Sequence, residues 1–511
     1  MKIMKKLLTC LLVLALLCGP VSLAQVTSSG LPIVDEPVSF EILVDDYGTP
    51  EEKIMYPILE EMTGVHVDLQ LYPYEVARER LNTLLMGNDY PHVLAGWTLS
   101  TSDIIELGMS DGLLLPLEDL IETYAPNISA VLDEPGVREA MTLPDGHIYT
   151  IPFLVNEPLV NYLPYINSEW LDRLGLSVPT TPGELKEVLI AFRDEDANGN
   201  GDPNDEIPFS GTPDNLSLGM CAGWFGVDAY EKSEYPFFYR DGDTIRFAAN
   251  TEEYREFIRY FADLYQEGLI DPELFTQDES MWTAKVNQGL VGVCISYNQP
   301  IEGSYVYLPV LKGCDEPVFH RSSNGTSLFR SQVALTDRCD EDMAATIIRW
   351  FDVTFDPDVS IQLEHGPLGD SIVKLDEHLF QMVDRSDWSA EKDETYAWYN
   401  YYTQSLPKNN KDNVLLSAGE DTPVPDYKAE ADAAYEPYLN EIFPAVWLED
   451  ETDIRRASTL SVDINSYVKT KMAQWITGQA NVDEEWDAYL AQLEQYGLTE
   501  LTEIYQRILF G

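Results

Sequence analysis

Basic residues are scarce in this chain. Of its 511 residues, 32 are Lys or Arg and 88 are Asp or Glu, so the formal net charge at pH 7 is −56. Nucleic-acid binding needs clustered Lys and Arg on the phosphates, and docking on anionic lipid needs basic patches. The shortage of positive charge therefore excludes nucleic acid as a partner and argues against an anionic membrane surface. It suits a protein that works in solution outside the cytoplasm.

Long apolar runs are almost missing as well. The exception, Leu7–Leu17, follows three lysines and precedes the small residues of Ser22-Leu23-Ala24. This order is typical of a secretory signal peptide that is cleaved after Ala24. We therefore expect residues 1–24 to be a signal peptide, residues 25–36 a flexible leader, and the protein to be secreted or extracytoplasmic. Cys18 is a poor candidate for a lipid anchor, because its neighbours match a lipoprotein signal badly.

Cysteine is rare, and several catalytic motifs are absent. Two of the six cysteines lie in the signal peptide, and the other four lack the close paired spacing of a zinc site. One disulfide and buried free thiols both remain open for them. The chain has no serine-elbow motif, no zincin helix and no phosphate-binding glycine loop. The four cysteines are Cys221, Cys294, Cys314 and Cys339.

One acidic loop, residues 194–208, has a pattern that suits a hard cation. Oxygen-bearing side chains recur at every second position from Asp196, and Gly201 permits a sharp turn. Calcium takes six to eight oxygen ligands at ~2.3–2.6 Å, and the loop resembles the first half of an EF-hand. The match stops at position twelve, which is Ile207, and an alternative register starts at Asp194. The predicted ligands are Asp196, Asn198, Asn200, Asp202, Asp205 and Glu206.

The cation would be structural, because nothing beside the loop looks catalytic. It would clamp a long loop to the end of the helix that precedes it. The competing interpretation is an acidic Asn-Gly turn without a metal, in a protein that is acidic throughout.

Near the N-terminus the apolar pattern predicts alternating strands and helices. Strands are expected at Ser39–Val44, Val65–Leu71 and Pro91–Gly96, and amphipathic helices at Glu51–Met62 and Glu75–Met86. This order is typical of an α/β fold with a mostly parallel sheet. In such sheets, ligands bind beyond the carboxyl ends of the strands.

Aromatic residues near predicted strand ends are the candidate ligand contacts. Trp97 follows the third strand, and Tyr297 follows a β-rich run at Gln288–Ser296. Trp224 lies in a Gly-Trp-Phe-Gly turn. For each candidate, packing in a core or on the surface is the alternative. The predicted ligand-binding residues are Trp97, Tyr297, Trp224, Trp282 and Trp398.

Several separated segments resemble the family 1 extracellular solute-binding proteins, the sugar-capturing components of bacterial ABC importers. The resemblance extends from about residue 40 to the end of the chain, and the long calcium-loop branch, which includes the alginate-oligosaccharide binders, is the most similar. His92 and the segment 167–171 depart from the family pattern. The segments are Leu59–Val65, Trp170–Leu176, Pro179–Leu185, Asn198–Gly201, Asp205–Pro208, Leu264–Glu273, Trp475–Gly478 and Glu485–Tyr489.

This resemblance implies a two-lobed α/β fold of the periplasmic-binding-protein type, with a hinge and an interlobe cleft. The first lobe would comprise residues 37–155 and about 298–355, and the second about 156–297 and about 356–511 with the calcium loop. The implied function is to capture an oligosaccharide by lobe closure and deliver it to the membrane subunits of an ABC transporter. We expect a monomer that is not an enzyme.

Two alternative functions remain open from the sequence. A secreted carbohydrate-active enzyme needs only two carboxylates, which could lie among the 88 acidic residues, although no spacing singles out a pair. A peptide-binding receptor of the same architecture is the other. The sequence does not identify the sugar.

Overall fold

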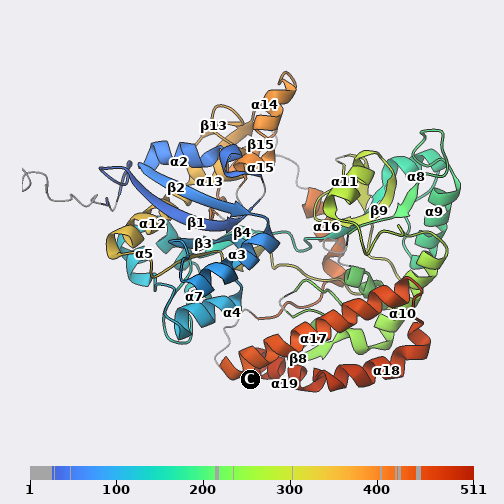
Figure 1. Cartoon of the computed structure of the whole chain (residues 1–511). Helices are drawn as coiled ribbons and strands as arrows, with labels where there is room; N and C mark the ends of the chain where they lie inside the picture. The colour runs from blue at the N-terminus through green and yellow to red at the C-terminus, as the bar shows by residue number, and fades with distance from the viewer. Residues whose placement is uncertain are drawn as a thin grey trace, which may run out of the picture. The chain divides into compact units, whose positions relative to one another are not determined.

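The chain divides into two compact units, each with its own sheets and helices (Figure 1). Unit 1 comprises Met1–Asn156 and Ser327–Pro425, and unit 2 comprises Glu157–Thr326 and Asp426–Gly511. The chain therefore passes between the units three times. The computed structural model describes residues 26–27, 29–46, 48–212, 218–233, 235–301, 303–402, 406–420, 423, 427–444 and 451–511.

The main sheet of unit 1 has the strand order β12-β3-β1-β2. β1 (Val38–Asp45) pairs in parallel with β2 (Val65–Tyr72) and with β3 (Val93–Ala95), and β12 (Val333–Leu335) runs antiparallel to β3. Residues 42–44 of β1 are all buried, as expected for a central strand covered on both faces. The predicted α/β pattern of this region is confirmed.

Helices α2 (Met55–Thr63) and α3 (Tyr74–Gly87) follow β1 and β2. Gly64 ends α2 in the left-handed conformation, with φ 78°, which glycine adopts without strain. Asn88 is the left-handed residue at the end of α3, with φ 51°. Asparagine tolerates this conformation because its short polar side chain bonds locally.

Helix α12 (Glu341–Thr354) lies at the centre of the core of unit 1. Its Trp350 is fully buried and contacts Phe40 of β1 edge-on, with ring centroids 5.5 Å apart. Its Asp352 accepts hydrogen bonds from the backbone N–H groups of Asn127 (2.7 Å) and Ile128 (3.0 Å), which begin a neighbouring helix. The other helices of unit 1 are η1 (Pro50–Glu52), η2 (Gly96–Thr98), α4 (Thr101–Ile104), the π-helix η3 (Ile105–Ser110), α5 (Glu118–Tyr124), α6 (Pro126–Leu132), α7 (Val137–Met141), α13 (Pro357–His365), α14 (Ala390–Thr395) and α15 (Trp398–Tyr401).

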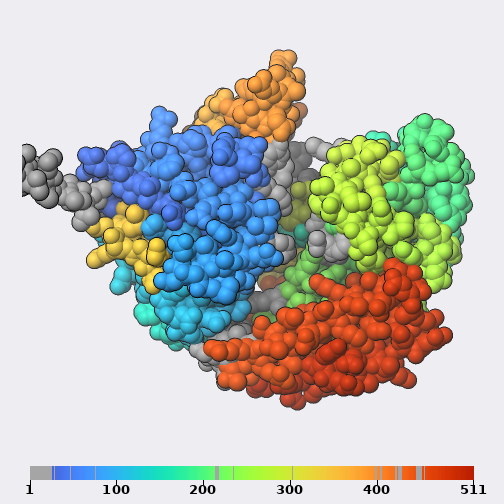
Figure 2. Space-filling model, viewed as in Figure 1, coloured from blue at the N-terminus to red at the C-terminus, as the bar shows by residue number. Residues whose placement is uncertain are grey.

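A second sheet of unit 1 is built from β13 (Ile372–Asp376), β14 (Leu379–Met382) and β15 (Val414–Leu416). It packs on α13 through a small cluster that includes Ile361 and Phe380. With α14 it projects from the surface of unit 1 (Figure 2, orange). A two-stranded sheet pairs β4 (Phe153–Asn156) with β11 (Thr326–Phe329).

The main sheet of unit 2 has the order β10-β5-β9-β6. β5 (Leu163–Asn167) runs antiparallel to both β9 (Val291–Ser296) and β10 (Tyr305–Tyr307), and β6 (Ile207–Phe209) runs parallel to β9. All five residues of β5 are buried. A separate hairpin pairs β7 (Phe238–Asp241) with β8 (Thr244–Phe247).

The helices of unit 2 pack with continuous apolar stripes. In α10 (Glu252–Gln266) the buried residues have helical spacing and are Tyr254, Phe257, Ile258, Phe261 and Leu264. Helices α17 (Glu451–Ile476), α18 (Val482–Gln495) and α19 (Leu498–Phe510) cover one side of the unit (Figure 2, red). The other helices are α8 (Ser168–Leu174), α9 (Pro182–Asp194), η4 (Leu218–Phe225), η5 (Ala248–Asn250), α11 (Glu279–Asn287), α16 (Tyr427–Tyr435) and η6 (Glu436–Tyr438).

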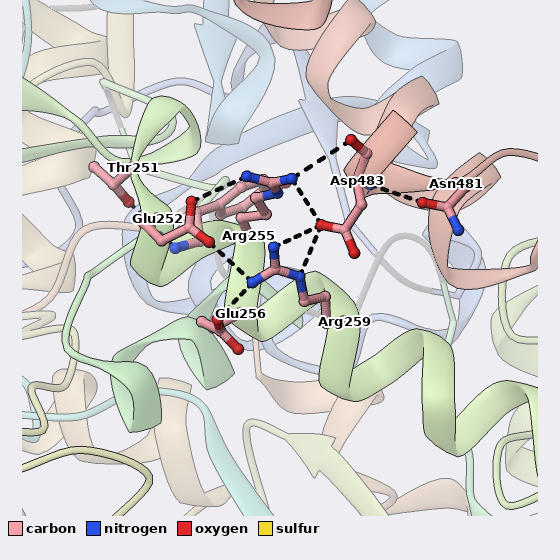
Figure 3. A network of polar contacts seen from close by, with 8 residues as sticks. Thr251, Glu252, Arg255, Glu256, Arg259, Asn481 and Asp483 are labelled. Atoms are coloured by element: carbon pink, nitrogen blue, oxygen red, sulfur yellow. Dashed lines mark hydrogen bonds and ion pairs between the residues drawn. The ribbon is translucent and has the colours of Figure 1, made fainter. Parts of the chain in front are cut away.

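A network of charges ties α10 to the first turn of α18 (Figure 3). Arg259 donates to one carboxylate oxygen of Asp483 from Nε (2.9 Å) and Nη2 (2.6 Å), and Arg255 reaches the same oxygen at 2.8 Å. These guanidinium groups lower the pKa of Asp483. A carboxylate in the first turn of a helix is further stabilised by the helix dipole.

Three expectations about the division of the chain differ from the structure. Residues 298–326, expected in the first lobe, lie in unit 2 because β10 pairs with β5, and residues 356–425, expected in the second, lie in unit 1 because α13 packs on α12. The expected leader 25–36 is partly packed, because Ile33 and Val34 are buried in the core of unit 1. The signal peptide and Cys18 lie outside the described residues. None of the described helices combines the length and apolarity that a membrane span requires.

Candidate ligand and cation sites

Trp97 stands directly after β3, where the parallel strands of unit 1 end. It is the middle residue of η2, and its side chain is 40% exposed. The edge of its ring system lies against Phe329, with centroids 4.8 Å apart. Gly96 begins the turn with φ 79°, and a Cβ atom there would lie 2.3 Å from Oδ1 of Asp45. Only glycine permits this approach of the turn to the end of β1.

The turn that carries Trp97 is held from two sides. Oδ1 of Asp45 accepts a hydrogen bond from the Thr98 hydroxyl at 3.0 Å, and the same carboxylate accepts from the Trp97 backbone. Arg78 of α3 donates to the Thr98 carbonyl at 2.6 Å and forms a two-pronged ion pair with Asp103 (2.5 and 3.1 Å). Burial raises the pKa of Asp45, although these hydrogen bonds oppose the rise. The backbone of the turn that carries the indole is therefore held in place by several hydrogen bonds.

A buried ion pair lies beside this turn. Nζ of Lys53 lies 2.9 Å from Oδ2 of Asp46, and both side chains are almost fully buried. Burial lowers the pKa of Lys53, and the neighbouring Asp46 carboxylate opposes this shift. The pair therefore places two charges, each balanced by the other, at the carboxyl end of β1.

Tyr297 occupies the corresponding position in unit 2, directly after β9. Its side chain is 40% exposed, and Nζ of Lys428 lies 3.2 Å from its ring centroid. The ring of Tyr162 packs against it edge-on at 5.7 Å. Lys428 also donates to the Asn161 carbonyl at 3.2 Å. Tyr297 is thus an aromatic ring supported by Lys428 and Tyr162 that stays 40% exposed.

Two of the other predicted aromatic contacts are packed in the interior. Trp224 is fully buried and stacks on Phe261 at 6.2 Å in the core of unit 2. Trp282 is 7% exposed and is buried in the same core. Neither offers a ring face to a ligand, and this corrects the expectation for both. Trp398 begins α15, but its side chain lies outside the described residues.

The acidic loop connects α9 to β6 and folds back on itself as predicted for an EF-hand-like turn. Gly199 and Gly201 have φ values of 74° and 95°. The Gly201 N–H donates to Oδ2 of Asp196 at 3.1 Å, which joins positions one and six. The amide groups of Asn198 and Asn200 both donate to the Asp205 carboxylate, at 2.9 and 2.6 Å.

The acidic loop also contains carboxylate oxygens without partners. Oδ1 of Asp196 and Oε2 of Glu206 are buried, and neither accepts a hydrogen bond in the described structure. Burial and the nearby Asp205 raise the pKa of Glu206. Buried carboxylate oxygens of this kind are ligands that a hard cation would satisfy. The donor set therefore fits calcium, although no group of three or more His, Cys, Asp or Glu in the described residues already has metal-binding geometry.

Asp202 differs from the other predicted ligands of the loop. Its Oδ1 accepts from the backbone N–H (3.2 Å) and side-chain amide (3.0 Å) of Asn204. Asn204 is not among the predicted ligands, although it occupies position nine of the EF-hand register. Position nine of an EF-hand often binds calcium through a water molecule, so the register itself indicates Asn204 as a candidate.

The described cysteines are all free thiols. Cys221, Cys294 and Cys339 are buried, and Cys314 is partly exposed. Of the two possibilities left open by the sequence, the structure has the free thiols.

Two α/β units, each with an exposed aromatic ring just after a strand, match the arrangement in which α/β proteins bind small ligands. No family model matches the chain. It is 31% identical over 479 residues to the fructooligosaccharide ABC transporter substrate-binding protein FusA of Streptococcus pneumoniae, and the alignment covers 90% of this chain and 87% of FusA. The chain therefore belongs to the extracytoplasmic substrate-binding proteins of ABC transporters.

Two solved structures of S. pneumoniae FusA show the same fold. One is an EF-hand mutant in complex with fructo-nystose, and the other is a complex with kestose. Each matches with a TM-score of 0.78 and 27% sequence identity, over 92% of this chain and 98% of the FusA chain. The predicted family and the α/β fold of the periplasmic-binding-protein type are thereby confirmed.

Proposed function

We propose that this protein captures a neutral oligosaccharide of the fructan type and delivers it to the membrane subunits of an ABC transporter. The observation that carries the proposal is its 31% identity to FusA over nearly the whole of both chains. FusA is named for fructooligosaccharides, and its structures hold kestose and fructo-nystose.

The aromatic residues that we propose as ligand contacts are Trp97 and Tyr297. Sugar rings have apolar C–H faces that stack on flat aromatic rings. Both side chains are 40% exposed, and the turn that carries Trp97 is held rigidly by hydrogen bonds. Capture would proceed by closure of two lobes on the sugar, and the protein would act as a monomer.

Isothermal titration calorimetry with kestose and nystose tests the proposal. We expect saturable binding of at least one of them, and no comparable binding of maltotriose or of short peptides. Preferential binding of peptides would instead support the peptide-receptor alternative. Release of free fructose during prolonged incubation would indicate a carbohydrate-active enzyme and overturn the proposal that the protein only binds its ligand.

We also propose that the acidic loop binds one calcium ion with a structural role. Asp196, Asn198, Asn200, Asp205 and Glu206 would hold it, and the buried unpartnered oxygens of Asp196 and Glu206 support this choice. Asp202 would contribute through its backbone carbonyl, as position seven of an EF-hand does. The ion would fix the connection between α9 and β6.

A further inference from the structure

Lys408 is a buried cation that the ligand contacts described above do not include. Its side chain is 4% exposed, and its Nζ atom is buried without a hydrogen-bond partner among the described residues. An ammonium group has three donors, and a buried charged donor left unsatisfied is strongly unfavourable. Because the fold keeps the Lys408 ammonium in its interior, we expect a hydrogen-bond acceptor that is not among the described residues.

The backbone around Lys408 is anchored on both sides. The Pro407 carbonyl accepts a hydrogen bond from the Thr354 hydroxyl at 2.5 Å, and the Asn409 N–H donates to Ser360 at 3.0 Å. The position of Lys408 is therefore fixed by α12 and α13.

Two aromatic faces surround the ammonium of Lys408. Nζ lies 4.4 Å from the ring centroid of Tyr402 and 5.3 Å from that of Phe153. Phe153 contacts Phe329 at 5.8 Å, and Phe329 in turn supports Trp97. Lys408 therefore belongs to the same aromatic cluster as the exposed indole that we propose as a sugar platform.

The nearby charges indicate what kind of acceptor is needed. The carboxylates of Glu364 and Asp46 interact electrostatically with the Lys408 ammonium. Both already have other partners, because Asn410 donates a hydrogen bond to Glu364 at 2.5 Å and Lys53 forms an ion pair with Asp46 at 2.9 Å. Lys53 and Lys408 thus face Asp46 and Glu364, and the Asp45 carboxylate lies next to Asp46, so no excess of positive charge is left for an anion. An uncharged oxygen suits this position better than an anion does.

We propose that the Lys408 ammonium is a ligand-binding group that donates hydrogen bonds to hydroxyl oxygens of a neutral sugar seated against this aromatic cluster. The proposal rests on the function proposed above. It makes Lys408 a residue that determines specificity, because a sugar without a hydroxyl at that point would leave the buried donor unpaired.

Lys408→Met tests this role, because methionine keeps the apolar length of the side chain and removes its donors. We expect the Kd for kestose to rise about tenfold to a hundredfold. The Tm of the ligand-free protein should stay the same or rise, because a desolvated charge is removed. Lys374→Met is the matched control. Lys374 lies on β13 of the same unit and pairs with Asp358 at 2.6 Å, and its variant should bind kestose like the unmodified protein.

A Kd for Lys408→Met within twofold of the original would overturn the proposal, and so would a loss of affinity that only follows a large fall in Tm. If this variant does not fold, Lys408→Gln serves with the same expectations. Failure of the unmodified protein to bind kestose would count against the fructan assignment alone, and the variants would then be compared on whichever neutral oligosaccharide binds. If no sugar binds at all, both proposals are wrong.

Discussion

Trp97 and Trp224 carry the same side chain in opposite environments, and this difference makes them a matched pair. Trp97→Ala should weaken sugar binding about tenfold or more and change the stability by less than ~1 kcal/mol, because the ring is 40% exposed. Trp224→Ala should lower the stability by about 3–5 kcal/mol, because Trp224 fills the core of unit 2.

Calorimetry with kestose and thermal denaturation of both variants measure the two effects. Below its lower Tm, the Trp224 variant should bind kestose with unchanged affinity. Normal affinity in the Trp97 variant would remove that residue from the proposed site.

Glu231 makes stability depend on pH near neutrality. Its side chain is 6% exposed, Oε2 has no hydrogen-bond partner among the described residues, and burial raises its pKa to about 7. The unfolded chain ionises this group near its ordinary value of 4.5, whereas the folded protein keeps its proton until about pH 7. The folded state therefore binds more protons between these values, and stability falls as pH rises from about 4.5 to about 7.

Glu231→Gln should remove this loss. At pH 8 the variant should be more stable than the original by an amount on the order of 3 kcal/mol, and at pH 4 the two should be similar. Denaturant titrations at both pH values measure the difference. Parallel stability curves from pH 4 to pH 8 would contradict the expectation.

Residue type and position along the chain identify an exposed aromatic residue more readily than they show that another aromatic residue is buried. Trp97 and Tyr297 could be singled out because each follows a strand, and strand ends in α/β units are open to ligands. Trp224 and Trp282 could not be excluded, because their burial depends on helices distant in sequence. Lys408 was missed for the same reason: its aromatic neighbour Phe153 is about 250 residues earlier in the chain.

At the scale of elements, the calcium ion that we propose for the acidic loop between α9 and β6 predicts that stability depends on calcium. Saturating calcium should raise the Tm, and a chelator should lower it by several degrees, because the ion stabilises only the folded loop. Asp196→Asn should abolish most of this difference, since Oδ1 of Asp196 is one of the buried unpartnered oxygens.

Differential scanning fluorimetry with calcium and with EDTA measures the effect, and Asp243→Asn is the control. Asp243 has an 89% exposed side chain outside the loop, so its variant should keep the full response to calcium. A Tm that is the same in calcium and in EDTA would show that the loop is an acidic turn without a metal.

Local elements were more predictable than their assembly. The strands and helices of residues 38–87 follow from apolar periodicity and a glycine cap, and they lie within a few residues of their expected bounds. The assignment of residues 298–326 and 356–425 to the two units could not be predicted from the sequence. It depends on the pairing of β10 with β5 and the packing of α13 on α12, and neither contact leaves a local pattern in the sequence.

At the scale of the whole molecule, the net charge of −56 bears on the choice of ligand. A field of this sign repels anionic sugars such as oligogalacturonates at low salt, and a neutral trisaccharide does not feel it. Salt screens the field, since the Debye length falls from about 10 Å at 0.1 M to about 3 Å at 1 M. Binding of kestose should therefore change less than twofold between about 0.02 M and about 0.5 M NaCl.

Calorimetry at the two salt concentrations, in saturating calcium, separates ligand charge from other effects. Trigalacturonate, as the anionic comparison, should bind undetectably at low salt and gain affinity, if it binds at all, as salt is added. A kestose affinity that depends steeply on salt, or tight binding of trigalacturonate at low salt, would mean that local positive charge dominates the site. Lys408 and Lys53 would then act as an anion-binding pair, and the balance of charge argued for unit 1 would be wrong.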